Sequence, residues 1–225
     1  MEKVLMLLIV VTALFVGPAK AGIVIGGTRI IFDAKNKEAS ASIKNTSKAD
    51  VFLIQSWLES EAAGQKPPFI VTPPLFRINA GEENLLRIVL TDNSLPKDRE
   101  SVFWLNVKSI PAQDTSKSAS NVLQVVIKSR LKFFYRPEGL EGTPEDAWQR
   151  LTPARSGSQL ELTNPTPYYV SLYSLKVDGA EIKEADLVPP KGKVRFALPS
   201  AAASRVSWQA ISDYGSISSE EQRTL

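Results

Sequence analysis

Short segments that alternate apolar and polar residues, separated by turn residues, make up most of the chain after residue 22. Stretches with the 3.6-residue period of an amphipathic helix are scarce, whereas a period of two is typical of strands with one buried face. The pattern predicts seven strands in the first half of the chain, at residues 23–32, 39–44, 51–58, 69–71, 75–78, 85–90 and 102–107. Pro73-Pro74 falls between two of them and predicts a break or a sheet edge there.

The strand pattern restarts after Pro137-Glu138-Gly139, at residues 159–163, 168–177, 193–198 and 205–211. Many short strands with regular turn signals are typical of an immunoglobulin-like sandwich. We therefore predict an all-β protein with two immunoglobulin-like β-sandwich domains, at residues 22–140 and 141–225.

The first 21 residues have the pattern of a secretion signal. Residues 4–16 are apolar apart from one Thr, with Lys3 before them and Pro18-Ala19-Lys20-Ala21 after them. The run is shorter than the ~20 apolar residues of a transmembrane helix, and Ala19 and Ala21 fit the small-residue pattern before a cleavage site. We predict Sec-dependent export and cleavage after Ala21, and a membrane anchor is the alternative.

The composition restricts the chemistry. The 225 residues include no His and no Cys, which excludes a Ser-His-Asp triad, a Cys nucleophile, zinc sites built from these residues and every disulfide. With 27 Lys and Arg against 24 Asp and Glu, the net charge of +3 does not indicate a nucleic-acid partner. An enzyme would have to use carboxylates, Lys, Tyr or Ser. A glycosidase with a pair of carboxylates is one example, but the candidate acids Glu59 and Glu61 lie in polar sequence typical of a surface.

Residues 121–137, NVLQVVIKSRLKFFYRP, contain no Gly, and their one Pro is the last residue. Strands average 5–6 residues, whereas this one would run for about 14, or roughly 45 Å. Alternation divides it into a mainly apolar row and a row rich in basic residues. The first row is Leu123, Val125, Ile127, Ser129, Leu131, Phe133 and Tyr135; the second is Val122, Gln124, Val126, Lys128, Arg130, Lys132, Phe134 and Arg136.

A strand of that length would overhang a small sandwich, and its projecting end would offer an apolar row and unpaired backbone groups to another chain. One alternative is a long core strand with a solvated basic face. Another is a nucleic-acid surface, formed by the basic residues beside Phe133, Phe134 and Tyr135.

Arg29 stands in an otherwise apolar predicted strand. A charged residue there is usually paired or at a strand end. Arg29 is therefore either a surface residue whose stem is buried or a cation for an anionic ligand, because the guanidinium fork suits a carboxylate.

Several motifs occur together and in order. They are LPKDRESVFWLN at 95–106 with Ile110-Pro111, NVLQ at 121–124, LKFFYRP at 131–137, NPTPYYV at 164–170 and DYG at 213–215. In this order they closely resemble the periplasmic pilus-assembly chaperones, the PapD-like family of Gram-negative bacteria. Residues 22–32 and Thr72-Pro73-Pro74 also fit. The nine-residue stretch 112–120 and the lack of Cys resemble the short-loop subclass.

The resemblance implies two immunoglobulin-like domains in a boomerang arrangement, working in the periplasm. Family members bind pilin or fimbrial subunits that lack a strand, lend them their own long strand, and deliver them to an outer-membrane usher. No enzymatic activity, cofactor, metal, nucleic acid or small-molecule substrate is implied. The exposed strand would also allow self-association of the free protein.

The resemblance also assigns roles by motif position. Arg29 and Lys132 would hold the C-terminal carboxylate of the subunit. Leu123, Val125 and Ile127 would be the donor residues. Glu100, Arg136 and Asp213 would form a charge cluster between the domains. The alternative function is a structural pilus or adhesin subunit, although such subunits resemble single incomplete sandwiches with a Cys pair.

Overall fold

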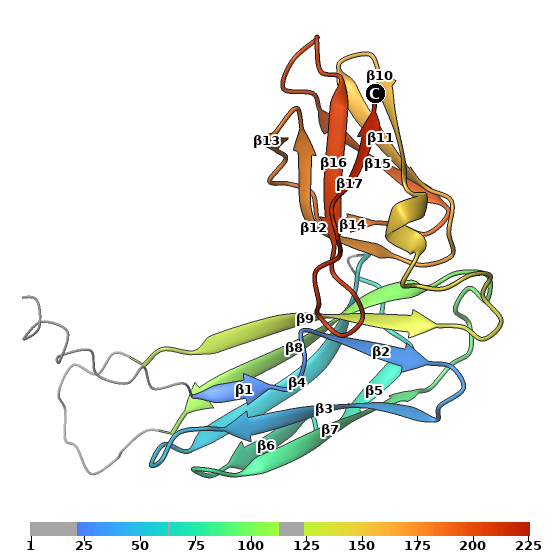
Figure 1. The fold of residues 1–225 in the computed structure, drawn as a ribbon. Coiled ribbons are helices and arrows are strands. Elements are labelled where there is room, and N and C mark those ends of the chain that lie inside the picture. The colour runs from blue at the N-terminus through green and yellow to red at the C-terminus, as the bar shows by residue number, and fades with distance from the viewer. Residues whose placement is uncertain (1–21, 63, 113–123) are drawn as a thin grey trace, which may run out of the picture.

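The computed structural model describes residues 22–62, 64–112 and 124–225. Within these ranges the chain forms strands in two domains that meet at an angle (Figure 1). The predicted signal segment and Leu123 lie outside the described residues. No helix in the described part is long and apolar enough to cross a membrane.

The first domain is a sandwich of two sheets. One sheet has the strand order β1 (Ile23–Ile25), β3 (Glu38–Asn45), β7 (Glu83–Leu90) and β5 (Phe69–Thr72). The other has the order β2 (Arg29–Asp33), β9 (Ile127–Arg136), β8 (Ser101–Pro111), β4 (Phe52–Ser60) and β6 (Leu75–Ile78). Between the sheets the ring of Phe69 packs edge-on against Phe133 and Phe103, with centroid distances of 5.0 and 5.1 Å.

The single strand predicted over residues 23–32 is wrong, because the chain there changes sheets. β1 pairs with β3 in one sheet, whereas β2 pairs with β9 in the other. Gly27 lies between them with φ of 87°, a backbone conformation that favours glycine. The break predicted at Pro73-Pro74 is confirmed, since β5 and β6 on either side of it are edge strands of different sheets.

The strand predicted over residues 121–137 is shorter than expected, because β9 has 10 residues and begins at Ile127. Its ladder with β8 starts at the pair Ile127 and Ser109, and β8 ends at Pro111, which has no N–H to donate. The described residues 124–126 therefore extend beyond the last rung.

The second domain has its own sheets and core. One sheet has the order β10 (Thr152–Ser156), β11 (Gln159–Asn164) and β15 (Gly192–Ala197). The other has the order β13 (Ala180–Glu181), β12 (Val170–Val177), β16 (Arg205–Ala210) and β17 (Glu221–Thr224), with β14 (Leu187–Val188) also on β12. A short 3-10 helix, η1 (Ala147–Arg150), precedes them. Trp208 is fully buried, and its Nε1 donates to the Trp148 carbonyl over 2.9 Å.

The predicted strands of the second domain are confirmed as β11, β12, β15 and β16. The pattern missed β10, β13, β14 and β17, which have at most five residues each and little alternation.

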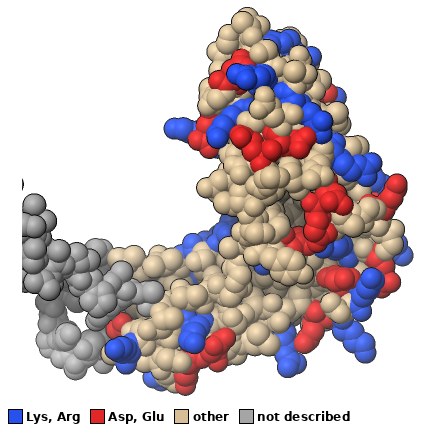
Figure 2. Space-filling model, viewed as in Figure 1, with Lys and Arg blue, Asp and Glu red and all other residues tan. Residues whose placement is uncertain are grey.

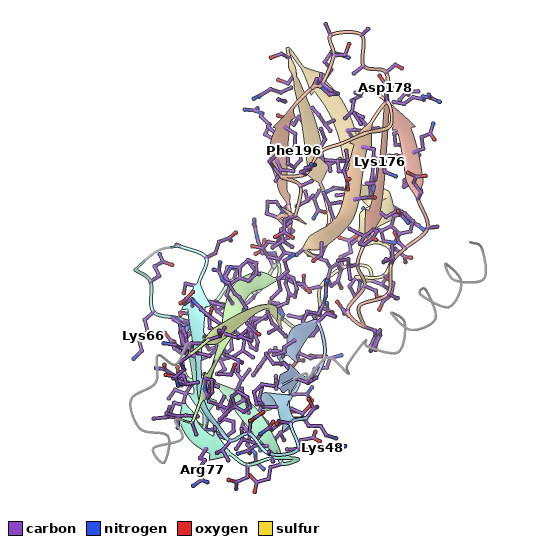
Figure 3. All side chains as sticks on the ribbon, turned by 90° about the vertical axis from the view of Figure 1, so that its left-hand side faces the viewer. Lys48, Lys66, Arg77, Lys176, Asp178 and Phe196 are labelled. Atoms are coloured by element: carbon purple, nitrogen blue, oxygen red, sulfur yellow. The ribbon has the colours of Figure 1, made fainter. Side chains whose placement is uncertain are left out.

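The two buried clusters occupy separate lobes. In Figure 3 Lys66 and Arg77 lie on one lobe and Lys176 and Phe196 on the other, in accord with two distinct hydrophobic cores. On the face drawn in Figure 2, positive and negative side chains are interspersed on both domains. The lobes meet near the end of β9, where Phe134 of β9 packs against Tyr169 of the second domain with a ring-centroid distance of 5.7 Å (Figure 1).

Candidate functional site

β9 has a partner strand along its whole length on one side only. It pairs with β8 from Ile127 to Tyr135, but with β2 only from Lys132 to Arg136. Among the described residues, no strand pairs with residues 127–131 on the side away from β8. Unpaired N–H and C=O groups on such an edge can pair with a strand of another chain.

The apolar row of β9 runs out of the core along this edge. Tyr135, Phe133 and Leu131 are buried, with exposed fractions of 4%, 0% and 9%. Ile127 and Val125 continue the row but are 60% and 59% exposed. Single exposed apolar residues are normal on a protein surface, but an apolar row beside an unpaired strand edge marks an interaction site. Of the three predicted donor residues the structure therefore places Val125 and Ile127 at the surface.

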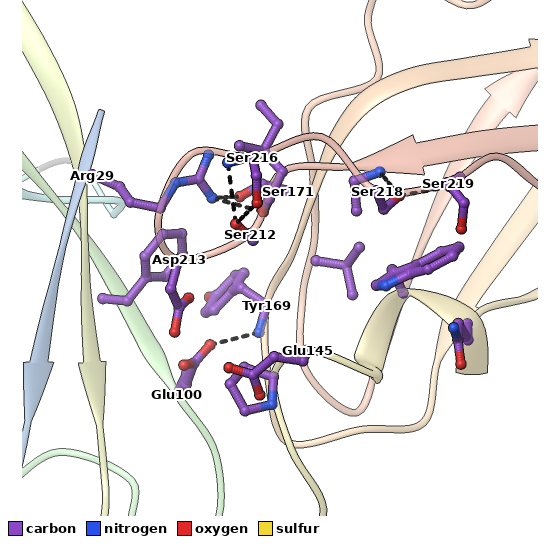
Figure 4. Close-up of a pocket in the computed structure, with 17 residues that line it drawn as sticks. Arg29, Glu100, Glu145, Tyr169, Ser171, Ser212, Asp213, Ser216, Ser218 and Ser219 are labelled. Atoms are coloured by element: carbon purple, nitrogen blue, oxygen red, sulfur yellow. Dashed lines mark hydrogen bonds between the residues drawn. The ribbon is translucent and has the colours of Figure 1, made fainter. Parts of the chain in front are cut away.

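Arg29 and Lys132 lie side by side. They are direct partners in the parallel β2–β9 ladder, at the rung where β2 begins to cover the edge of β9. Both side chains point toward the second domain. Arg29 Nη1 donates to Ser171 Oγ over 2.9 Å and to the Ile211 carbonyl over 3.2 Å (Figure 4). Lys132 Nζ forms an ion pair with Asp186 Oδ1.

Arg29 carries a charge that is partly removed from water. Its Nε atom is buried and has no hydrogen-bond partner among the described residues. Burial lowers the pKa of Arg29, and the nearby charges of Asp213 and Asp186 oppose this effect. A desolvated cation with an unused donor gains from a nearby anion.

A hollow of about 260 Å³ lies between the domains at this point (Figure 4). Its lining includes Arg29 and Glu100 from the first domain and Trp148, Tyr169 and Asp213 from the second. Arg29 therefore faces a hollow in the domain junction, and a small acidic group can approach it.

Glu100, Arg136 and Asp213 form one connected cluster across the junction. Arg136 Nε donates to Glu100 Oε1 over 2.6 Å, and Arg136 Nη1 donates to Asp213 Oδ2 over 2.7 Å. Glu100 Oε2 accepts from the Tyr169 N–H over 2.7 Å, and the Arg136 guanidinium lies 5.4 Å from the centroid of the Tyr168 ring. One arginine thus joins carboxylates from two domains.

Burial acts strongly on both Glu100 and Arg136. It raises the pKa of Glu100, and the contacts with Arg136 and the Tyr169 N–H only partly offset it. For Arg136, burial by itself would lower the pKa, but the bonds to Asp213 and Glu100 outweigh burial and raise it. The guanidinium therefore stays charged, and the Glu100 carboxylate, which is 3% exposed, depends on it.

Two family models match the chain. The N-terminal domain of the PapD pili and flagellar-assembly chaperones matches residues 22–141, and the C-terminal PapD domain matches residues 146–222. The chain belongs to the PapD-like family of pilus-assembly chaperones.

Individual relatives agree with this assignment. Chaperone protein FimC of Escherichia coli K12 is 44% identical over 202 residues, which cover 89% of this chain and 83% of that protein. Chaperone protein LpfB of Salmonella typhimurium is 42% identical over 197 residues, which cover 86% and 85%.

Solved structures of the family have the same two-domain fold. A chain in the complex of the Salmonella enterica SafA pilin with the SafB chaperone superposes with a TM-score of 0.83 at 32% identity, covering 93% of this chain and 99% of that chain. The E. coli chaperone DraB gives 0.79 at 35% identity, covering 91% and 96%. The predicted all-β fold and the predicted chaperone function are confirmed, and the protein is a periplasmic chaperone of pilus assembly.

The basic row of the chaperone's β9 is packed against tryptophans. The Arg130 guanidinium lies 4.2 Å from the ring centroid of Trp104, and Lys128 Nζ lies 5.0 Å from that of Trp57. Glu59, which the sequence offered as a candidate acid, accepts from Trp57 Nε1 over 2.8 Å and lies 3.5 Å from Lys128 Nζ. These contacts join the basic side chains of β9 to β8 and β4, along the part of β9 whose other edge has no neighbour strand among the described residues.

Sequence reasoning missed Ser171, Ile211 and Asp186, which contact Arg29 and Lys132. Ser171 lies in a strand, and Asp186 in the polar segment before β14, and neither stands out by spacing or composition. Only the docking of the second domain shows that they belong to the site.

Replacing Arg136 with Ala is expected to lower the free energy of unfolding by about 3–5 kcal/mol, because Glu100 is then left buried without a cation. Urea unfolding followed by tryptophan fluorescence measures this. The matched control is Lys191→Ala, which breaks the exposed pair of Lys191 with Asp98, also between the domains, and should change stability little. Equal stability of Arg136→Ala and the parent protein would contradict a stabilising role for the cluster.

Proposed function

We propose that this chaperone captures pilin subunits by lending them the exposed row and free edge of β9. The observation that carries the proposal is that the row becomes exposed, at Ile127 and Val125, on the part of the chain that no described strand covers on the side away from β8. A subunit that lacks a strand presents an apolar groove with unpaired backbone groups. β9 supplies the apolar side chains that fill such a groove and the strand edge that pairs with its backbone groups.

Each apolar donor side chain that enters the groove contributes roughly 1.5–3 kcal/mol. The main-chain ladder satisfies backbone groups that would otherwise be buried unpaired. We assign Val125 and Ile127 to this row, with Leu123, which lies outside the described residues, as its next member.

Arg29 and Lys132 form the end of the binding site in this proposal. A subunit strand on the free edge of β9 and strand β2 compete for the same side of β9, and β2 begins at Arg29. The subunit strand must therefore stop there, and a chain that ends at this point brings its terminal carboxylate to both cations. Since β9 runs from Ile127 toward Lys132, the bound strand runs parallel to β9.

The carboxylate clamp, by which we mean Arg29 and Lys132, also sets the register. A strand shifted by one residue would present its other face to the donor row. A fixed chain end excludes that shift. The eight residues from Val125 to Lys132, which are joined by seven steps of about 3.3 Å, span roughly 23 Å, enough for a short subunit strand.

We further propose that Glu100, Arg136 and Asp213 hold the two domains, at residues 22–140 and 141–225, at a fixed angle. The clamp cations contact the second domain, so their position depends on that angle. Delivery of the subunit to an outer-membrane usher follows from family membership, and the protein acts by binding, without catalysis.

Co-expression of the chaperone with a pilin of its own organism tests the proposed function. We expect a soluble complex of one chaperone and one pilin in the periplasmic extract, measured by size-exclusion chromatography with light scattering. A pilus subunit would instead form polymers of its own. Pilin that stays insoluble at the same level with and without the chaperone would refute the proposal.

The mature protein is expected to begin at Gly22, because the predicted signal is cleaved after Ala21. The intact mass of the protein purified from the periplasm should equal that of residues 22–225. A protein that keeps residues 1–21 and sediments with membranes would support the anchor instead.

A further inference from the structure

Both cations of the clamp have partners in the second domain, and the partners of Arg29 differ in charge from the partner of Lys132. Arg29 contacts neutral acceptors, the Ser171 hydroxyl and the Ile211 carbonyl. Lys132 contacts a carboxylate, that of Asp186. An incoming carboxylate can therefore reach Arg29 without displacing another anion, but at Lys132 it meets a position that is already occupied by Asp186.

We propose that Asp186 is an internal competitor for the clamp: its carboxylate occupies Lys132 in the free chaperone and is displaced by the C-terminal carboxylate of the subunit. The inference rests on the proposed function, in which Arg29 and Lys132 bind that carboxylate. Asp186 then acts as a specificity-determining residue. A ligand must displace Asp186 to reach Lys132. A free carboxylate without an accompanying apolar strand therefore does not occupy the clamp.

The burial of the two partners favours an exchange. The Lys132 side chain is 15% exposed, so leaving its ammonium group without an anion is costly. The Asp186 side chain is 57% exposed and can return to water when it is displaced. A subunit carboxylate that replaces Asp186 keeps Lys132 paired at every stage.

The backbone of Asp186 is held in place, so the exchange requires only a side-chain movement. Its carbonyl accepts from the Leu172 N–H over 2.7 Å, and the next residues, Leu187 and Val188, pair with β12. Asp186 also acts electrostatically on Arg29. Its charge therefore opposes the approach of a second carboxylate to either cation.

Asp186→Asn removes the competing charge and nearly preserves the shape of the side chain. The probe is a pair of synthetic peptides with one alternating apolar sequence, one ending in a free α-carboxylate and the other in a carboxamide. We expect the full-length mature Asp186→Asn chaperone to bind the carboxylate peptide about two- to fivefold more tightly than the parent does. Its affinity for the amide peptide should be unchanged, as measured by fluorescence anisotropy.

Asp98→Asn is the matched control, because it removes a carboxylate of similar exposure, 52% against 57%, from another ion pair between the domains, with Lys191. It should leave both affinities unchanged. Equal or weaker binding of the carboxylate peptide by Asp186→Asn would overturn the competitor role. Lys132→Met tests the clamp separately: if it binds the carboxylate peptide as tightly as the parent does, the proposed function itself fails at this site.

Discussion

Val125→Glu is expected to abolish the capture of pilin subunits, whereas Val126→Glu is expected to retain it. The two valines are neighbours and are both exposed, at 59% and 42%. Both lie just before β9, and the alternation of the strand, continued to them, gives them opposite faces, so that only Val125 shares the face of Ile127 and the buried Phe133. A charge at Val125 would be buried unpaired in the subunit groove, whereas a charge at Val126 stays in water.

Co-purification of a His-tagged subunit with each variant measures the contrast, and circular dichroism confirms that both variants are folded. Gln124 is a poorer control, because its side-chain amide donates to the Pro111 carbonyl over 2.6 Å and Glu cannot replace that donor. If both valine variants capture equally, or if Val126→Glu is the damaging one, the donor register is wrong. A Val125→Glu variant should also show less self-association in analytical ultracentrifugation if the free chaperone associates through this row.

Arg29→Ala and Lys132→Ala are each expected to reduce subunit affinity by about 30-fold or more, since truncating one partner of a buried charge pair costs at least ~2 kcal/mol. The cause is the loss of one of two cations at the rung where β2 begins. Lys132→Arg should also be impaired, because the guanidinium differs from the ammonium in reach and geometry. Surface plasmon resonance with an immobilised subunit measures these affinities.

Lys128→Ala is the control for charge alone. Lys128 lies on the same strand and face as Lys132, but its side chain is 45% exposed and pairs with Glu59. The Lys128→Ala variant should bind subunits nearly as tightly as the parent protein does. Normal piliation of cells that carry Arg29→Ala or Lys132→Ala would exclude the clamp.

The alternation of residues was enough to predict most of the first domain. β3, β5, β6, β7 and β8 lie where a period of two predicts them, because one face of each strand packs on the core. The residues that share each face of β9 were predicted in the same way. The pattern did not predict that residues 23–32 form two strands, because an apolar run has the same appearance whether it stays in one sheet or crosses to another.

The sequence and its motifs also singled out every member of the charge cluster and both clamp cations, since each lies in a distinctive segment. The residues that contact the clamp cations could not be predicted in this way. Asp186 lies 54 residues from Lys132, and Ser171 lies 142 residues from Arg29. No local pattern relates residues at such separations, so the partner of Lys132 emerged only when the second domain was in place.

The all-β fold, the two domains and the side chains that share a face of β9 could be predicted from the sequence, because these features follow from the local period of two and from turn residues. The folded chain was needed to show where β2 stops covering the edge of β9, which members of the apolar row are exposed, and that Asp186 forms an ion pair with Lys132. These features depend on where β2 begins, where β8 ends and how the domains meet. Such contacts join distant segments, and only the folded chain brings them together.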